Sequence, residues 1–166
     1  TEGGTSDLWY LDFETGDEPT QFLATDAFEF FPRFSPDGRY IAYVSNESGR
    51  QEVYVKRFPS GEGKWQVSVD GGVWPQWSSD GTRLFFAGGD DILEVDVTVE
   101  PTIRLGTPRT LFSRLSFSYP MPAGLPPGFA ASADGSRFLV VQPVEDDSFD
   151  RSVTVVLNWF EEFRKR

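Results

Sequence analysis

The chain has 166 residues, of which 39% are hydrophobic and 16% aromatic, and its formal net charge is −11 at pH 7. This composition is too apolar for a disordered chain and is enough for one domain with a core. The negative charge repels phosphate backbones and anionic lipids, which argues against nucleic-acid or membrane-surface partners. Because cysteine and histidine are both absent, thiolate chemistry, Cys-type zinc sites and Ser-His-Asp or Cys-His catalysis are excluded.

No apolar run approaches the length of a membrane span, so we predict none. The chain starts at Thr1 with neither a methionine nor a signal-like segment, and we expect it to be a processed or excised piece of something longer. Since no set of reactive side chains converges in the sequence, we predict no catalytic residues, no cofactor and no metal.

Strand-like segments follow one another along the whole chain, separated by glycine, proline and polar turns. In chain order, the predicted strands are 7–13, 20–25, the arms of a hairpin at 32–45, 51–58, 64–69, the arms of a second hairpin at 75–88, 92–97, 108–112, the arms of a third hairpin at 129–142, and 152–159. The last residues, FEEFRKR at 160–166, predict a short helix with Trp159, Phe160 and Phe163 on one side.

The three hairpins share the turn sequence Ser-x-Asp-Gly. Its glycine favours the left-handed conformation that such a turn requires, and its aspartate suits the turn position before it. We therefore predict turn-forming roles, and neither metal binding nor catalysis, for these residues: Asp37, Gly38, Asp80, Gly81, Asp134 and Gly135. Asp37 and Asp80 lie 43 residues apart, and Asp80 and Asp134 lie 54 apart, which is close to the length of one propeller blade.

The predicted fold class is all-β: a β-propeller of four-stranded antiparallel blades, with about three blades in the chain. The predicted division of this single domain, 1–166, is a half blade at 1–26, whole blades at 27–70 and 71–112, a long insert at 113–128, a last blade at 129–160 and a tail at 161–166. The insert is rich in proline and glycine. We expect it either to cover a binding face, to reach a partner subunit or to pack over a blade edge.

Aromatic and polar residues gather at the first strand of each blade, which lies nearest the central channel of a propeller. An aromatic ring beside an arginine or glutamine at a channel mouth suits binding of a small ligand or a peptide. The candidate ligand-binding residues are Phe30, Arg33, Trp74 and Gln76, with Phe31 beside them. The alternative is that these aromatic residues form the core between blades, and for Phe34 and Trp77 we predict the core.

Two acidic loops have the composition of a cation site. Gly88–Asp91 and the segment 145–150 each bring carboxylates together, but neither has the spacing of a known calcium loop. We predict solvated turns at both places.

The repeat resembles a known family. FSPDGRYIAYVS at 34–45 resembles the repeat of TolB-like β-propellers, which are related to WD-type repeats. More narrowly, the segments PRFSPDGRYIAYVSNESGRQEVYVKRFP, KWQVSVDGG and PQWSSDG resemble the propeller found C-terminal to some bacterial serine/threonine protein kinases. The Gly-rich loop and the His-Arg-Asp loop of a kinase are absent. The resemblance implies a sensory or scaffolding propeller in the periplasm or elsewhere outside the cytoplasmic membrane.

The resemblance also implies a ring of six or seven blades, more than this chain contains. Either two chains form one ring, a homodimer being favoured, or the chain is a piece of a larger propeller. We expect a non-catalytic module that binds a peptide, a protein or a small ligand, as the sensor part of a signalling protein. The alternatives are an accessory propeller of a prolyl-oligopeptidase-like hydrolase and a purely structural fragment.

Overall fold

The computed structural model describes residues 5–14, 16, 18–99, 102–113 and 128–140. Every regular element in these residues is a β-strand, and the strands pair antiparallel, which confirms the all-β class. No helix in the same residues is long and apolar enough to cross a membrane. Several predictions fall outside the described residues: the strand at 152–159, the acidic loop at 145–150, the terminal helix and most of the 113–128 insert.

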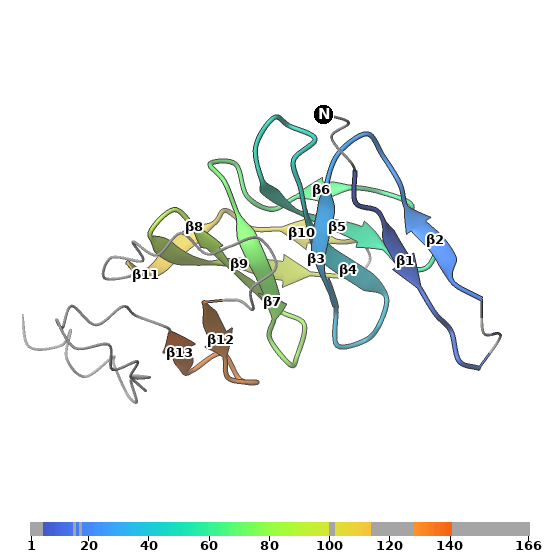
Figure 1. Ribbon diagram of the computed structural model, residues 1–166. Coiled ribbons are helices and arrows are strands. Elements are labelled where there is room, and N and C mark those ends of the chain that lie inside the picture. Colours follow the sequence, from blue (N-terminus) through green and yellow to red (C-terminus); the bar gives the residue numbers. More distant parts are fainter. Residues whose placement is uncertain (1–4, 15, 17, 100–101, 114–127, 141–166) are drawn as a thin grey trace, which may run out of the picture.

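Two sheets have the strands of a whole blade (Figure 1). The first contains β3 (Glu29–Phe34), β4 (Tyr40–Ser45), β5 (Glu52–Arg57) and β6 (Trp65–Gln66), in that order. The second contains β7 (Val73–Trp77), β8 (Arg83–Gly88) and β9 (Asp91–Thr98), followed by an outer edge in two pieces, β10 (Arg104–Leu105) and β11 (Arg109–Ser113). The sequence predicted one outer strand at 108–112. The structure adds β10, and Gly106 N–H donates to Asp96 O at 2.8 Å where the chain passes from β10 to β11.

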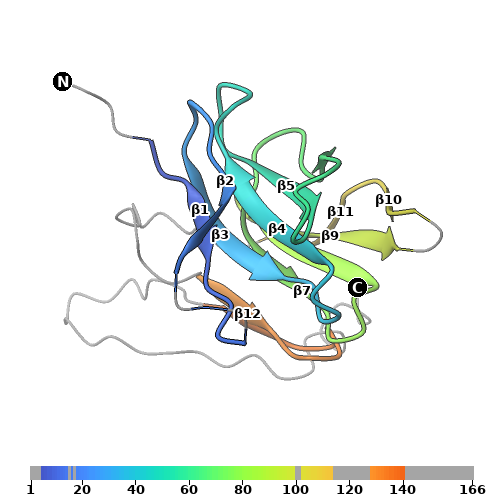
Figure 2. The same ribbon diagram turned by 90° about the vertical axis from the view of Figure 1, so that its right-hand side faces the viewer.

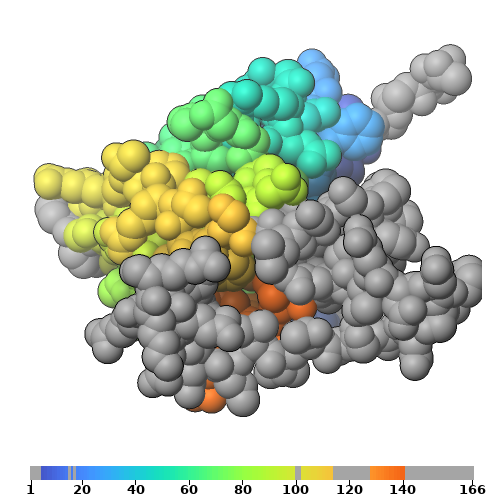
Figure 3. Space-filling model, turned by 90° about the vertical axis from the view of Figure 1, so that its left-hand side faces the viewer, coloured from blue at the N-terminus to red at the C-terminus, as the bar shows by residue number. Residues whose placement is uncertain are grey.

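A two-stranded sheet lies at each end of the molecule. β1 (Leu8–Tyr10) pairs with β2 (Thr20–Leu23), and β12 (Phe129–Ala131) pairs with β13 (Phe138–Val140). Figure 1 shows the first pair on the right and the second at the lower left, and Figure 2 looks onto the end that carries β1 and β2. In the space-filling view, the sheets follow one another across the molecule in sequence order (Figure 3).

The sheets pack face to face because their middle strands are apolar on both sides. All six residues of β4 are buried, and four of the six in β8 are buried, as expected for strands covered on both faces. One core cluster lies between the two whole sheets and includes Ala42, Val55, Leu84 and Val95. Two smaller clusters join each terminal pair of strands to its neighbouring sheet.

The prediction that Phe34 belongs to the core is wrong, because its side chain is 55% exposed. Trp77, which occupies the same place one repeat later, is partly buried against the core between the two whole sheets. The two residues differ because Trp77 faces a complete sheet, whereas Phe34 faces the side of the two-stranded sheet β1–β2. The Phe34 ring packs edge-on against Phe58, at 4.9 Å between centroids.

Candidate functional site

All three Ser-x-Asp-Gly turns have the same hydrogen bonds. In the first turn, Ser35 Oγ donates to Asp37 Oδ1 at 2.6 Å and accepts from Tyr40 N–H at 3.0 Å. Gly38 N–H donates to Ser35 O, and the glycine has a φ of 70°. The same bonds recur around Ser78, Asp80 and Gly81 and around Ser132, Asp134 and Gly135. The aspartates and glycines therefore have the predicted turn geometry.

These bonds keep the turn aspartates ionised. Partial burial raises the pKa of Asp37, but hydrogen bonds from Ser35 and Arg39 outweigh this effect and hold the pKa at about 2. Hydrogen bonds from Ser78 and Thr82 lower the pKa of Asp80 to about 2. The pKa of Asp134 is lowered by bonds of the same kind. The carboxylates are thus occupied within their own turns.

A pH titration of stability tests this role. A carboxyl whose folded pKa lies below its unfolded pKa of 3.8 stabilises the fold above pH 4, and this contribution is lost as the pH falls through about 2. In the Asp80→Asn variant, we therefore expect the free energy of unfolding to fall less between pH 4 and pH 2 than in the unmodified chain, as measured by urea unfolding. Asp26→Asn, which removes a carboxyl from an exposed bend, is the control. Equal slopes for the two variants would contradict the assigned role of Asp80.

Gln76 connects two inner strands. Its Nε2 donates to Phe129 O at 2.8 Å, and its Oε1 accepts from Ala131 N–H at 3.0 Å, so both ends of the side-chain amide bind the backbone of β12. Its predicted role in ligand binding is untested. The two bonds fix the orientation of this amide, and they leave it one N–H and one lone pair.

Arg33 occupies the equivalent place on β3 and makes no such connection to any of the residues that the structure describes. A guanidinium has only donors, so it cannot accept a backbone N–H as Gln76 does. Arg33 is exposed, its Nη1 donates to the neighbouring Pro32 O at 3.1 Å, and its own carbonyl accepts from Trp77 Nε1 at 3.2 Å. The inner strand β3 therefore exposes the cationic side chain of Arg33 to solvent, whereas Gln76, at the equivalent position of β7, joins two sheets.

Each inner strand of the whole sheets contains a bulge at an aromatic residue. Phe31 and Trp74 have φ values of 54° and 56°, and both precede a proline. Left-handed backbone is strained for aromatic residues, and such strain is found preferentially at functional sites. The two rings lie 6.2 Å apart, and Phe30 packs edge-on against Phe31 at 5.0 Å. Trp74 Nε1 is buried and has no hydrogen-bond partner within the described part of the chain.

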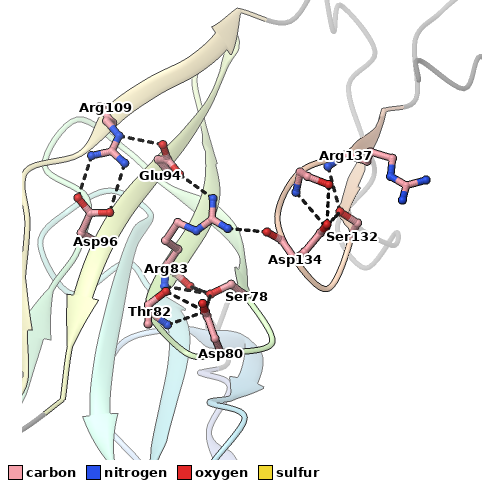
Figure 4. Close-up of polar contacts among 11 residues, drawn as sticks. Ser78, Asp80, Thr82, Arg83, Glu94, Asp96, Arg109, Ser132, Asp134 and Arg137 are labelled. Carbon is pink, nitrogen blue, oxygen red and sulfur yellow. Dashed lines mark hydrogen bonds and ion pairs between the residues drawn. The ribbon is translucent and has the colours of Figure 1, made fainter. Parts of the chain in front are cut away.

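Further contacts attach β12 and β13 to the second whole sheet. Arg83 Nη2 donates to Asp134 O at 2.5 Å (Figure 4). Ser79 N–H donates to Ala133 O at 2.8 Å. A Cβ atom at Gly135 would lie 2.7 Å from Phe85 Cζ, so this turn needs a glycine both for its φ of 64° and for its close approach. The turns of the two whole sheets are less closely packed. A cavity of about 270 Å³ lies between them, lined by residues 35–37, 79–81 and 99.

A network of charged side chains extends across β8, β9 and β11. Arg109 Nε binds Glu94 Oε1 at 2.8 Å, its other nitrogens bind Asp96, and Arg83 lies 3.7 Å from Glu94 Oε2 (Figure 4). The bonds to Glu94 and Asp96 raise the pKa of Arg109. Sequence reasoning missed this network. The alternation of Glu94 and Asp96 on one strand was the signal available.

Two buried carboxyl groups lie where strands begin, at the opposite ends of the strands from the Asp-Gly turns. Glu52 accepts hydrogen bonds from Arg50 Nε at 2.7 Å, from Gly71 N–H at 3.0 Å and from Ser68 Oγ. Glu29 accepts from Thr25 Oγ1 at 2.5 Å, and burial raises its pKa. The sequence analysis did not select either residue.

The predicted acidic turn at Gly88–Asp91 joins β8 to β9. Asp91 Oδ2 accepts from Thr110 Oγ1 at 3.3 Å. Within the described residues, no group of three or more histidine, cysteine, aspartate or glutamate side chains could hold a metal ion. The geometry around this turn therefore gives no support for a calcium site.

Repeated antiparallel sheets that pack face to face, each with the same inner hairpin, define the chain as part of a β-propeller. It resembles the structure of a TolB protein from Agrobacterium tumefaciens, with a TM-score of 0.50 and 22% identity over 64% of this chain and 40% of that one. In sequence, a TolB homologue from Chlorobaculum tepidum is 28% identical over 109 residues, which are 62% of this chain and 25% of that protein. In fold and in sequence, the chain is thus similar to TolB β-propellers.

Two other relatives are similar over shorter segments. The Tol-Pal system protein TolB of Alcanivorax borkumensis is 39% identical over 46% of this chain and 18% of its own length. An uncharacterised peptidase, YuxL, of Bacillus subtilis is 31% identical over 48% of this chain and 12% of its own length. No protein-family model matches the chain. The chain thus spans a quarter or less of each of these curated relatives, and the narrower likeness to kinase-associated propellers stays a prediction.

Proposed function

We propose that the chain is a non-catalytic module that binds a peptide or protein segment along its inner strands. The observation that carries this proposal is the exposed Arg33 on β3, at the place where Gln76 of β7 is used to join two sheets. The strained aromatic residues Phe31 and Trp74 support it, because they lie on the same two inner strands. Phe30, Arg33 and Trp74 are the proposed ligand-binding residues.

The available groups suggest what kind of ligand would bind. The exposed guanidinium of Arg33 is a hydrogen-bond donor, so the ligand should offer acceptors. The net charge of −11 repels strongly acidic segments. A largely neutral peptide with backbone carbonyls or a single carboxylate meets both requirements.

The relatives suggest a setting for this binding. One of them is named as a component of a Tol-Pal system, which fits a propeller that acts by contacting other proteins. A role as the sensor part of a signalling protein and a location outside the cytoplasmic membrane are the finer parts of the proposal. The peptidase relative favours the alternative that the chain is an accessory propeller of a hydrolase.

A peptide array tests the proposed site. We expect the chain to bind neutral eight-residue peptides with a free carboxyl end more tightly than their amidated forms. Arg33→Ala should weaken this binding about tenfold, as expected for one charge-assisted hydrogen bond. Arg104→Ala, which changes an exposed arginine on the outer strand β10, should leave it unchanged. Absent binding, or equal losses in the two variants, would overturn the proposal.

A cleavage assay separates this proposal from a catalytic role of the chain itself. Fluorogenic peptides that bind on the array should remain intact when incubated with the chain. Cleavage that survives purification and scales with chain concentration would overturn the non-catalytic proposal.

A further inference from the structure

An arginine joins the second Ser-x-Asp-Gly turn to the third. Arg83, which follows the second turn, donates from Nη2 to Asp134 O of the third turn at 2.5 Å (Figure 4). Ser79 N–H of the second turn donates to Ala133 O of the third at 2.8 Å. Two neighbouring carbonyl oxygens of the third turn thus accept hydrogen bonds from the sheet that precedes it.

Neither bond has an equivalent between the first and second turns, in the part of the chain that the structure describes. Pro36 occupies the place of Ser79, and a proline has no N–H to donate. Tyr40 occupies the place of Arg83, and its side chain is only 3% exposed, within the core between the two whole sheets. The corresponding carbonyl oxygens of the second turn, Ser79 O and Asp80 O, therefore accept no hydrogen bond from the described residues.

The cavity of about 270 Å³ lies between these two turns. Ser79 and Asp80 line it from one side, and Pro36 and Asp37 line it from the other. Its volume is below the range of about 300–1,000 Å³ for drug-sized ligands, so its size suits a single side chain. The carbonyl oxygens and carboxylates of these residues are hydrogen-bond acceptors, which favours an occupant that donates.

The carboxylate of Asp80 adds a negative charge without a cationic partner. Its Oδ1 accepts all three hydrogen bonds that its own turn provides. Its Oδ2 accepts none from the described residues. By contrast, Oδ2 of Asp37 accepts from Arg39 Nε at 2.6 Å, and Oδ2 of Asp134 accepts from Ser136 Oγ at 2.7 Å. Because its pKa is about 2, Asp80 is ionised at neutral pH.

We propose that the cavity between the first two turns binds the guanidinium group of an arginine side chain from a partner protein, as Arg83 binds between the next two turns. A guanidinium has five donors in a planar fork, which matches two neighbouring carbonyl oxygens and a carboxylate. The net charge of −11 attracts a cationic segment. This inference goes beyond the proposed function and does not depend on the ligand-binding residues proposed there.

A titration with a capped arginine tests the site. N-acetyl-L-arginine amide carries one guanidinium and no other charge. In NMR spectra of the ¹⁵N-labelled chain, we expect it to shift the backbone amide signals of residues 79–81 in a saturable way. N-acetyl-L-lysine amide has the same charge without the planar fork, so it should bind several-fold more weakly.

Two variants test which groups bind the probe. Asp80→Asn should weaken the binding about tenfold, as expected for the loss of one charge-assisted hydrogen bond. Asp26→Asn is the matched control, because it removes the same charge from an exposed bend and should leave the binding unchanged. Pro36→Ser gives the first turn the Ser-Ser-Asp-Gly sequence of the second, so the turn should still form. Its new N–H is placed to donate to Ser79 O, and we expect it to weaken the binding of the probe.

Free L-arginine distinguishes a partner's side chain from a small molecule. It has the same guanidinium but adds an ammonium and a carboxylate group. The proposal expects free arginine to bind no more tightly than the capped form, and tighter binding would overturn the assignment to a partner protein. The site itself would be overturned by unshifted signals at residues 79–81, by equal binding of the lysine probe, or by equal effects of Asp80→Asn and Asp26→Asn.

Discussion

Replacing Phe85 by alanine is expected to lower the free energy of unfolding by about 3–5 kcal/mol, the range for removing a buried phenylalanine ring. The side chain is 0% exposed and lies between the second whole sheet and the β12–β13 pair. Its ring packs edge-on against Phe138 at 5.2 Å, with the Arg83 guanidinium 5.4 Å from its centroid. The nearby turn residue Gly135 has no side chain, so it cannot fill the cavity that removal of the ring would leave.

Urea unfolding followed by tryptophan fluorescence measures this loss. Phe13→Ala is the matched control, because Phe13 is 86% exposed and its removal should change the free energy of unfolding by about 0.5 kcal/mol or less. In the Phe85→Ala variant, amide hydrogen exchange should in addition show that residues 129–140 lose protection before the two whole sheets do. Equal costs for the two alanine variants would contradict the packing of β12 and β13 on β8.

The hairpins were predictable from sequence because their requirements are local. A left-handed glycine after an aspartate is set by the backbone of the turn itself, and Gly38, Gly81 and Gly135 all have φ between 64° and 70°. The middle strands were predictable for a similar reason, since an unbroken apolar run such as that of β4 suits a strand covered on both faces.

The contacts between sheets were not predictable in the same way. Arg33 and Gln76 occupy the same place in the repeat, yet only the glutamine can both donate to and accept from the next inner strand. Phe34 and Trp77 also correspond, and their burial depends on which strands lie opposite them. A repeat shows which positions are equivalent, whereas the neighbours of each position decide whether its residue packs, links two sheets or stays exposed.

Glu52 shows why a buried polar residue was missed in the sequence. It stands at the start of a strand among polar neighbours, so its burial at 0% exposure depends on the loop at 68–71 that folds over it. Ser68 Oγ accepts from Val53 N–H at 2.8 Å and donates to Glu52, whose other oxygen accepts from Arg50 and Gly71. The carboxylate thus ties β5 to the loop that leads into β7, and it accepts three hydrogen bonds in a buried place.

Glu52→Ala is therefore expected to lower the free energy of unfolding by about 2–3 kcal/mol, because it leaves buried donors without their charged acceptor. Glu52→Gln keeps one oxygen for Arg50 and Gly71 but turns an amide toward Ser68, so its cost should be smaller, about 1 kcal/mol. Glu47→Ala is the control, since its ion pair with Lys64 lies at the surface and pairs of this kind contribute about 0–1 kcal/mol. Urea unfolding of the three variants gives the order. A cost for Glu52→Ala no larger than that for Glu47→Ala would show that the loop at 68–71 is not held by this carboxylate.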